Sequence, residues 1–327
     1  TYGDRLHPKD KLDYVAELTK VLQETLDRGG NVVIPSFAVG RTQEILYFLR
    51  KIKVGRLVKG HEDFPVYVDS PMAVEATGVF QENRWECFDD EAMEFVKEGI
   101  NPIAFSGLKL SITSEESKAI NFDETPKVII SASGMCDAGR IRHHLKHNLW
   151  RPECTILFVG YQSVGTLGRA LVEGADEVKL FGETIDVQAE ICQLTGLSGH
   201  ADREGLLAWV NAFSPKPKRV FVIHGEDEVE NIFAQTLTEQ GFTACAPYNG
   251  EQWAIGAEGA VCLQEGSRVR LEHKPSEGAS RAATVFQRLV SAGKRLLRVI
   301  EHNEGGANKD LAKFADQINA LCDKWDR

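Results

Sequence analysis

The chain has 327 residues, a net charge of −10, and a composition that is 43% hydrophobic and 26% charged. This length allows two domains with buried cores, and the composition is typical of a soluble globular protein. No apolar run approaches the roughly 20 residues of a membrane-spanning helix, and the polar opening, residues 1–5, is not a signal peptide. The acidic balance argues against a protein that coats nucleic acid nonspecifically, but it leaves room for a nuclease with a local basic groove.

The first 250 residues alternate between helical and strand patterns. Leucines at helical spacing predict a helix that begins near residue 12 and ends at Gly29-Gly30. Another helix is expected over about 42–49. Short β-branched runs predict strands, each followed by Gly, Ser or Pro, at 31–35, 65–69, 127–131 and 155–159. This order predicts an α/β fold with a mostly parallel sheet.

The second half of the chain divides into three parts. Residues 178–191 resemble a hairpin with its turn at Gly182. A helix over 203–213, a strand over 219–223 and a helix over 229–240 predict a compact unit spanning 196–250. Residues 256–327 are expected to form a linker and a helical tail. That tail has strand-like pieces at 260–263 and 268–271, a linker at 274–278, and apolar-striped helices at 280–300 and 307–325.

Neither the cysteines nor the basic stretches of the chain predict a metal site. Seven cysteines without a CxxC pair indicate reduced thiols in a cytoplasmic protein, not a Cys-rich zinc site. The most cationic stretch, 140–147, predicts an RNA-facing or solvated helix, and 216–219 predicts a solvated loop. The histidines of the first stretch do not suit a metal, because His143 and His147 share a helix face while His144 points elsewhere.

Four small-residue loops follow predicted strands, at 35–41, 69–73, 131–135 and 160–163. Active sites of α/β proteins form at the carboxyl ends of parallel strands. Gly-Ser turns there can offer backbone N–H groups to a phosphate. Each loop alone has an ordinary explanation, since any strand-to-helix connection needs small residues.

Two histidines lie in similar contexts in the second half. His200 is in a Gly-flanked turn before a helix, and His224 follows a strand before another helix. A single histidine at a strand end is commonly a hydrogen-bonded structural group. Two of them across one helix and one strand favour a metal ligand or a general acid, the common roles of imidazole near neutral pH.

In their order, these motifs are similar to the β-CASP branch of metallo-β-lactamase-fold nucleases. This branch includes RNase J and the endonuclease of eukaryotic pre-mRNA 3′-end processing, and the likeness is greatest to its bacterial RNA-specific endoribonucleases. It covers about residues 1–250. The residues that carry it are Thr1 to His7, Pro35 to Arg41, Asp69 to Ala73, Ser131 to Met135, Gly160 to Gln162, Ser198 to Asp202 and His224 to Glu226.

The resemblance implies a domain division and a set of site residues. Residues 1–5 would end a first metallo-β-lactamase segment, 6–195 would form the β-CASP domain, and 196–255 would complete the metallo-β-lactamase αββα sandwich. His224 would bind one of two zinc ions and His200 would act at the scissile phosphate. Ser198 and Gly199 would hold that phosphate, while Ser133, Gly134 and Phe37 would line the RNA cleft.

One departure from the family pattern concerns the metals. The motif HxHxDH is absent from these residues, and so is the acidic residue expected just before Thr1. Because Thr1 is not a methionine, we expect that an upstream segment is missing. The intact enzyme would use two Zn²⁺ to make hydroxide, leaving a 5′-phosphate and a 3′-hydroxyl. This chain alone is expected to bind zinc at most partially and to be inactive.

The sequence leaves alternatives open. A non-catalytic RNA-binding or scaffold member could have lost its metal site, although retention of both histidines argues against that. A small-molecule metallo-hydrolase such as a thioesterase or lactonase would lack the long insert between residues 5 and 195. RNA is the expected partner, with no membrane, and the tail helices allow a homodimer. Cleavage could be internal or from the 5′ end.

Overall fold

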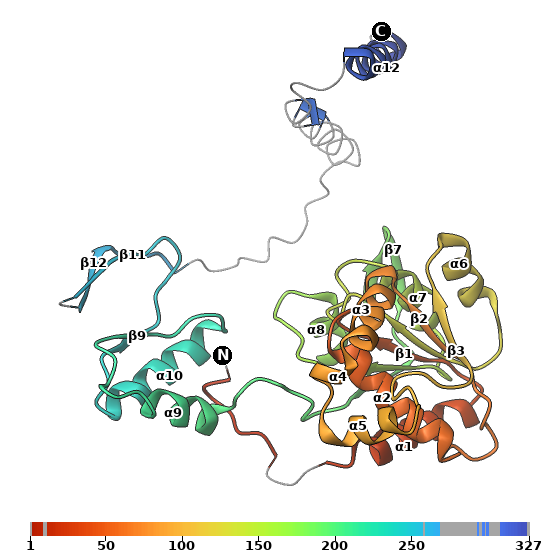
Figure 1. Ribbon diagram of the computed structural model, residues 1–327, viewed down its shortest axis with the longest axis horizontal. Helices are drawn as coiled ribbons and strands as arrows, with labels where there is room; N and C mark the ends of the chain where they lie inside the picture. Colours follow the sequence, from red (N-terminus) through yellow and green to blue (C-terminus); the bar gives the residue numbers. More distant parts are fainter. Residues whose placement is uncertain are drawn as a thin grey trace. The chain divides into compact units, whose positions relative to one another are not determined.

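The computed structural model describes residues 2–8, 12–257, 259–268, 293, 296–297, 299–300 and 308–325 (Figure 1). The chain divides into two units. The first comprises Thr1–Pro247 with Ile255–Ala260, and the second comprises Tyr248–Ala254 with Val261–Arg327. The candidate site residues all belong to the first unit. In the part of the chain that the structure describes, no helix is both long and apolar enough to cross a membrane.

The first unit is built on a six-stranded sheet with the order β3-β2-β4-β1-β5-β8. Every pairing in it is parallel, and β1 lies in register with β4 from Val32↔Val128 to Pro35↔Ser131. The predicted parallel α/β fold is therefore confirmed. The strands are β1 (Val32–Pro35), β2 (Val66–Asp69), β3 (Leu108–Ser111), β4 (Val128–Ser131), β5 (Thr155–Phe158) and β8 (Glu190–Gln193).

Helices cover both faces of this sheet. Alternate residues of each strand face opposite sides, so Ile34 and Ile130 enter one apolar cluster while Val33 and Ile129 enter the other. Burial on both faces explains why the strands are continuous apolar runs. The helices are α1 (Tyr14–Asp27), α2 (Arg41–Val54), α3 (Pro71–Glu82), α4 (Arg84–Cys87), α5 (Asp90–Lys97), α6 (Ser114–Phe122), α7 (Ile141–Asn148) and α8 (Leu167–Val172).

Two strands differ from the sequence prediction. The hairpin is formed by β6 (Glu177–Leu180) and β7 (Glu183–Asp186) and ends before residue 191. Residues 190–193 instead form β8, the edge strand parallel to β5, where Glu190 pairs with Arg28 at 2.6 Å. The edge strand β3 was not predicted, because Leu108 and Leu110 are its only apolar residues and both are partly exposed.

A smaller α/β arrangement follows β8 within the first unit. It contains α9 (Arg203–Asn211), β9 (Val220–Phe221), α10 (Asp227–Glu239) and β10 (Ala244–Cys245), with the two strands parallel. Its own core includes Val210, Phe233 and Leu237. The predicted helix–strand–helix order is confirmed, with a strand shorter than expected.

The remaining described elements are β11 (Gln252–Gly256), β12 (Gly259–Gln264) and α12 (Asn308–Trp325). The helix expected at 307–325 is thus present, and β12 contains the strand expected at 260–263. The linker at 274–278 lies outside the described residues, as does most of the strand at 268–271 and of the helix at 280–300.

Candidate functional site

The loops after β1, β4 and β5 meet at the carboxyl edge of the sheet. A Cβ placed on Gly134 would lie only 3.1 Å from the Phe37 ring and 3.2 Å from the Phe37 nitrogen, so the two loops touch. Gln162 of the third loop donates its amide to the Gly134 carbonyl at 2.9 Å. Three of the four predicted loops therefore form one surface, with Phe37 48% exposed on it.

Ser133 lies in the same surface, in a loop folded on itself. Its N–H donates to the Ala138 carbonyl at 3.2 Å, and its hydroxyl accepts from the Ala138 N–H at 3.5 Å. A hydroxyl that accepts locally keeps its own hydrogen for another acceptor. Contact of Ser133, Gly134 and Phe37 with RNA stays a prediction.

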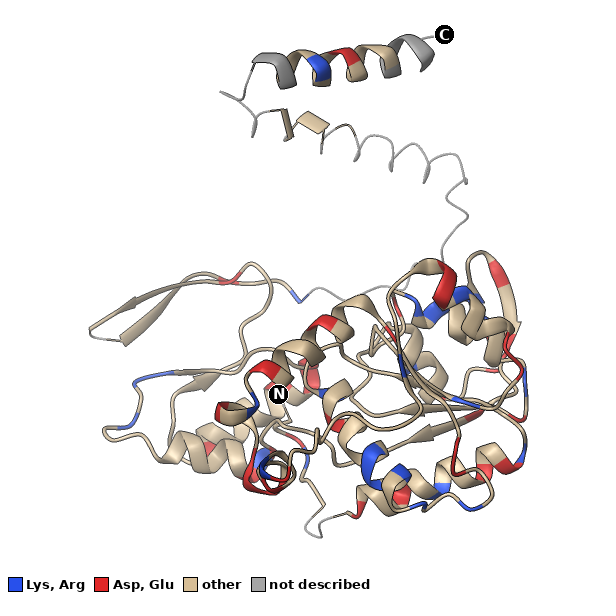
Figure 2. Cartoon of the chain, turned by 45° about the vertical axis from the view of Figure 1, so that its right-hand side comes forward, with Lys and Arg blue, Asp and Glu red and all other residues tan. Residues whose placement is uncertain are grey.

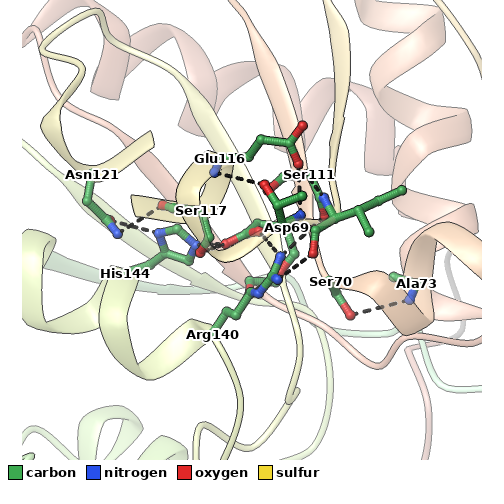
Figure 3. A network of polar contacts seen from close by, with 12 residues as sticks. Asp69, Ser70, Ala73, Ser111, Glu116, Ser117, Asn121, Arg140 and His144 are labelled. Carbon is green, nitrogen blue, oxygen red and sulfur yellow. Dashed lines mark hydrogen bonds and ion pairs between the residues drawn. The ribbon is translucent and has the colours of Figure 1, made fainter. Parts of the chain in front are cut away.

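The fourth loop, after β2, is organised by a buried carboxylate (Figure 3). Asp69 is fully buried and receives hydrogen bonds from Arg140 at 2.7 Å and from Ser117 at 2.5 Å. Its Oδ2 also lies 2.7 Å from Nε2 of His144, whose Nδ1 faces Asn121 at 2.8 Å. This loop supports the sheet edge from within, so Asp69 does not face a ligand.

The electrostatics of Asp69 follow from these contacts. Burial alone would raise its pKa, but the hydrogen bonds from His144 and Ser117 outweigh burial and lower the pKa to about 2. The carboxylate is therefore charged at neutral pH, with Arg140 as a cationic partner. A charged group in the interior requires such partners.

The sequence reading missed Asp69, Arg140 and His144 as a cooperating group. It correctly placed His144 on a different face of its helix from His143, since His144 is buried and His143 is exposed. The available signal was an aspartate that closes a buried strand and a histidine among the apolar positions of a helix. Neither feature says that the two residues are partners.

The loop that carries His200 is held by a short N-terminal segment. Asp202 caps α9 by accepting from the Gly205 N–H, and its second oxygen accepts from the His7 N–H, both at 2.9 Å. His7 Nε2 donates to the His200 carbonyl at 2.8 Å. The Tyr2 ring lies 5.6 Å from the His200 ring, centroid to centroid. Tyr2 and His7 of the N-terminal segment thus contact the turn that carries His200.

The phosphate-binding residues predicted beside His200 lie in the same exposed turn. The Ser198 hydroxyl accepts from the His200 N–H at 3.2 Å, and Gly199 and His200 are exposed. Arg41, at the start of α2, donates to the carbonyl of Leu197. The His200 turn is therefore fixed to the loop that also carries Phe37.

His224 is exposed and has a backbone φ of 65°, an uncommon value for a residue other than glycine. It precedes Glu226, the N-cap residue of α10, which accepts a hydrogen bond from the Tyr161 hydroxyl. Burial, followed by this bond, raises the pKa of Tyr161 to about 12, which keeps the phenol a donor at neutral pH. The contact ties the His224 loop to the loop after β5.

The described side chains do not fit a zinc site of the family type. No group of three or more His, Cys, Asp or Glu in the described ranges could hold a metal ion. Structural zinc sites use four protein ligands and catalytic ones generally three. His224 alone of the predicted ligands is present, so no catalytic step through zinc follows from these residues.

Comparison with known proteins identifies two family domains in the chain. Residues 42–171 match the Beta-Casp domain, and residues 184–247 match the Zn-dependent metallo-hydrolase RNA specificity domain. Both matches fall in the first unit. The first contains the loops after β2, β4 and β5, with Gly134 in the second of these, and the second match contains both His200 and His224.

Three relatives illustrate the similarity. Ribonuclease TTHA0252 of Thermus thermophilus is 39% identical over 243 residues, which cover 74% of this chain and 53% of the relative. Transcription termination factor FttA of Methanocaldococcus jannaschii is 34% identical over 72% of this chain and 37% of its own length. An RNase J-like protein of that organism is 33% identical over 72% and 53%, respectively.

The chain spans about half the length of the ribonuclease and a smaller share of the termination factor. The two domains occur in this chain in the order that the motifs predicted, and the three relatives are 33–39% identical to it. The chain belongs to the β-CASP family of metallo-β-lactamase-fold proteins.

Proposed function

We propose that the protein acts on RNA as a zinc-dependent ribonuclease in RNA processing or decay. The observation that carries this proposal is the hydrogen bond from Arg41, at the end of the loop after β1, to the Leu197 carbonyl beside the His200 turn. The RNA specificity domain that contains both histidines supports RNA as the substrate. Similarity to a ribonuclease and to an RNase J-like protein supports hydrolysis.

In this proposal the exposed His200 turn contacts the scissile phosphate. The Ser198 hydroxyl already accepts from the His200 N–H, so its hydrogen is free to donate to a phosphate oxygen. The His200 ring would stabilise charge on the phosphate or protonate the leaving oxygen. The hydrogen bond from His7 holds the His200 backbone and leaves the imidazole exposed.

The zinc part of the proposal concerns the whole protein, with His224 as one ligand. The described residues hold no cluster of three ligands, so we expect this 327-residue chain to bind RNA, to retain little zinc, and to cleave nothing alone. We further propose the domain division at residues 5, 195 and 255, action in the cytoplasm, and a homodimer through the tail.

The test compares the 327-residue chain with the product of the complete open reading frame, using RNA labelled at its 5′ end. The complete product should leave 5′-phosphate and 3′-hydroxyl ends, and a chelator should stop it. The variant His200→Ala should cleave about 10²- to 10⁴-fold more slowly while still binding RNA. A circular RNA distinguishes internal cleavage from digestion that starts at a 5′ end.

The matched control is His61→Ala, because His61 is also a partly exposed histidine but pairs with Asp27 at 2.9 Å on another part of the unit. It should cleave at the parent rate. Cleavage by His200→Ala at that same rate would contradict the proposed role, and inability of the complete product to cut RNA would remove the enzymatic proposal.

A second candidate is a non-catalytic RNA-binding member of the family. The described residues favour it in one respect, since they gather no metal cluster. It predicts RNA binding without cleavage by the complete product, with zinc retained by neither form. A small-molecule metallo-hydrolase is less well supported, because residues 42–171 match an additional domain and residues 184–247 match an RNA specificity domain. A thioester assay run beside the RNA assay tests it.

A further inference from the structure

A stacked aromatic and cationic cluster lies on the outer surface of α7 and the β6–β7 hairpin. The Phe181 ring is parallel-stacked on the His143 ring, with centroids 4.4 Å apart and an interplanar angle of 24°. The Arg142 guanidinium lies 5.1 Å from the centroid of the Phe181 ring. We call Arg142, His143 and Phe181 the stacking platform. None of its residues was assigned a role in the site described above.

The platform contributes little to the core. Phe181 is 48% exposed and belongs to neither apolar cluster of the sheet, although its neighbour Leu180 is fully buried. His143 is also exposed. Large apolar rings normally gain stability by leaving water, so the ring of Phe181 gains only part of what a core position would give.

The backbone conformation at residue 181 is also unusual for a phenylalanine. Phe181 and Gly182 form the two-residue turn of the hairpin, with φ values of 54° and 85°. Turns with positive φ at both central residues favour Asn-Gly, and a bulky residue at the first position is strained. Strain of this kind persists where the surrounding structure enforces it, commonly at sites with a function.

A second pair of rings, in edge-on contact, lies farther along α7. His147, one helical turn after His143, contacts the Phe122 ring of α6 at 5.8 Å between centroids, and Phe122 is 75% exposed. Trp150, seven residues after His143, is 53% exposed. A spacing of four residues places His143 and His147 on one face of α7, and Trp150 follows the end of that helix.

The charges favour a polyanion with flat groups as the occupant. Lys146 lies on the same helix and pairs with Glu183 at 2.7 Å, while Arg142 donates to the Asp137 carbonyl at 3.4 Å. Lys and Arg are otherwise interspersed with Asp and Glu along the chain (Figure 2). In a protein of net charge −10, affinity for RNA therefore has to come from local contacts such as this one.

We propose that the stacking platform binds unpaired RNA bases, as an accessory site beside the cleavage site. Proteins that bind single strands combine aromatic side chains, on which bases stack, with cationic groups that contact the backbone. A base would lie on the exposed part of the Phe181 ring while Arg142 contacts an adjacent phosphate. Because α7 begins directly after the loop 131–140, RNA held here could continue toward Ser133. The inference rests on the proposed RNA-binding function.

The test measures binding of a fluorescent oligouridine to the 327-residue chain by anisotropy, with Phe181→Asn and His143→Ala as variants. Each should weaken binding by about 5- to 100-fold. Phe181→Asn is chosen because Asn-Gly suits the turn, so thermal stability should be kept or raised while affinity falls. The matched control is Trp85→Ala, which removes another exposed ring that lies beside an arginine, Arg84, at 5.7 Å.

An abasic oligomer of the same length provides the second arm, since it keeps the phosphates and lacks the bases. The parent chain and Phe181→Asn should bind it equally. Equal affinity of parent and Phe181→Asn for oligouridine would overturn the platform and leave the proposed function intact. If Phe181→Asn lost as much affinity for the abasic oligomer as for oligouridine, base stacking on Phe181 would be overturned. If the parent chain bound no RNA at all, both the platform and the proposed RNA function would fall.

Discussion

Nε2 of His144 lies 2.7 Å from Oδ2 of Asp69, and both side chains are completely buried. The two residues are 75 positions apart, one at the end of β2 and the other in the middle of α7. Arg140, just before α7, completes the contact from the other carboxylate oxygen. This buried group therefore fixes the start of α7, and with it the orientation of both the 131–140 loop and the stacking platform.

Replacing Asp69 by Asn should destabilise the protein strongly. The variant removes the negative charge that lies between Arg140 and His144 and leaves the largely buried Arg140 guanidinium without its counter-ion. Breaking a buried pair from one side costs about 3–5 kcal/mol. Urea unfolding measures this directly. The control is Glu91→Gln, because Glu91 is an exposed partner of Lys51 and its loss should cost less than about 1 kcal/mol. Similar costs for both variants would contradict the role given to Asp69.

The free energy of unfolding should fall with acidification over a pH range set by the pKa of Asp69. Its folded pKa of about 2 lies below the ordinary 3.8, so the unfolded chain binds the proton more readily. The contribution is fully present above about pH 4 and is lost as the pH falls toward 2, amounting to about 2 kcal/mol. The variant Ser117→Ala removes one hydrogen bond to the carboxylate and should make this loss smaller and complete at higher pH. Unfolding free energies measured from pH 6 to pH 2 test the slope, and identical slopes for parent and variant would refute the assignment.

Two variants of Asp202 should distinguish the structural roles of its two carboxylate oxygens. Oδ1 caps α9 through Gly205, while Oδ2 holds the His7 N–H. Asp202→Ala should expose both amides to faster hydrogen exchange. Asp202→Ser keeps one oxygen, enough for the cap but not for both bonds, so the Gly205 amide should remain protected and the His7 amide should not. Equal protection of His7 in the parent and in Asp202→Ser would show that the N-terminal segment is held by other contacts.

Gly134→Ala should disturb the surface shared by the sheet loops. Its Cβ would meet the Phe37 ring at 3.1 Å and the Phe37 backbone nitrogen at 3.2 Å, so Phe37 must move away by a few tenths of an ångström. Overpacking of this kind costs about 1–3 kcal/mol. RNA affinity should fall as well if Phe37 lines the cleft. The control is Gly78→Ala in α3, where a Cβ meets nothing within 4 Å and should stabilise the helix by about 0.5–1 kcal/mol. A Gly134→Ala protein as stable as the parent would mean that the loops are not in contact.

The sequence by itself determined the features that depend on a few neighbouring residues, namely the buried strands and the local motifs. Runs such as Val32–Pro35 and Val128–Ser131 are apolar on both faces because helices cover both sides of the sheet, and that pattern is legible before any contact is known. The ordered motifs that end at His200 and His224 likewise identified the family, since each keeps its residue types and neighbours locally. The fold class and the family assignment came from this local information.

Only the tertiary structure decided which distant residues cooperate. A histidine at position 144 is compatible with many partners, and its pairing with Asp69 depends on how α7 crosses the sheet. The assignment of Glu190–Gln193 to the sheet depended on the open edge of β5, because a strand pattern does not specify its neighbour. The stacking of Phe181 on His143 joins the hairpin to α7, and no short window of the sequence contains both residues. Local pattern records burial and periodicity, whereas pairing between segments is settled by packing and by the burial of charge, which no single window contains.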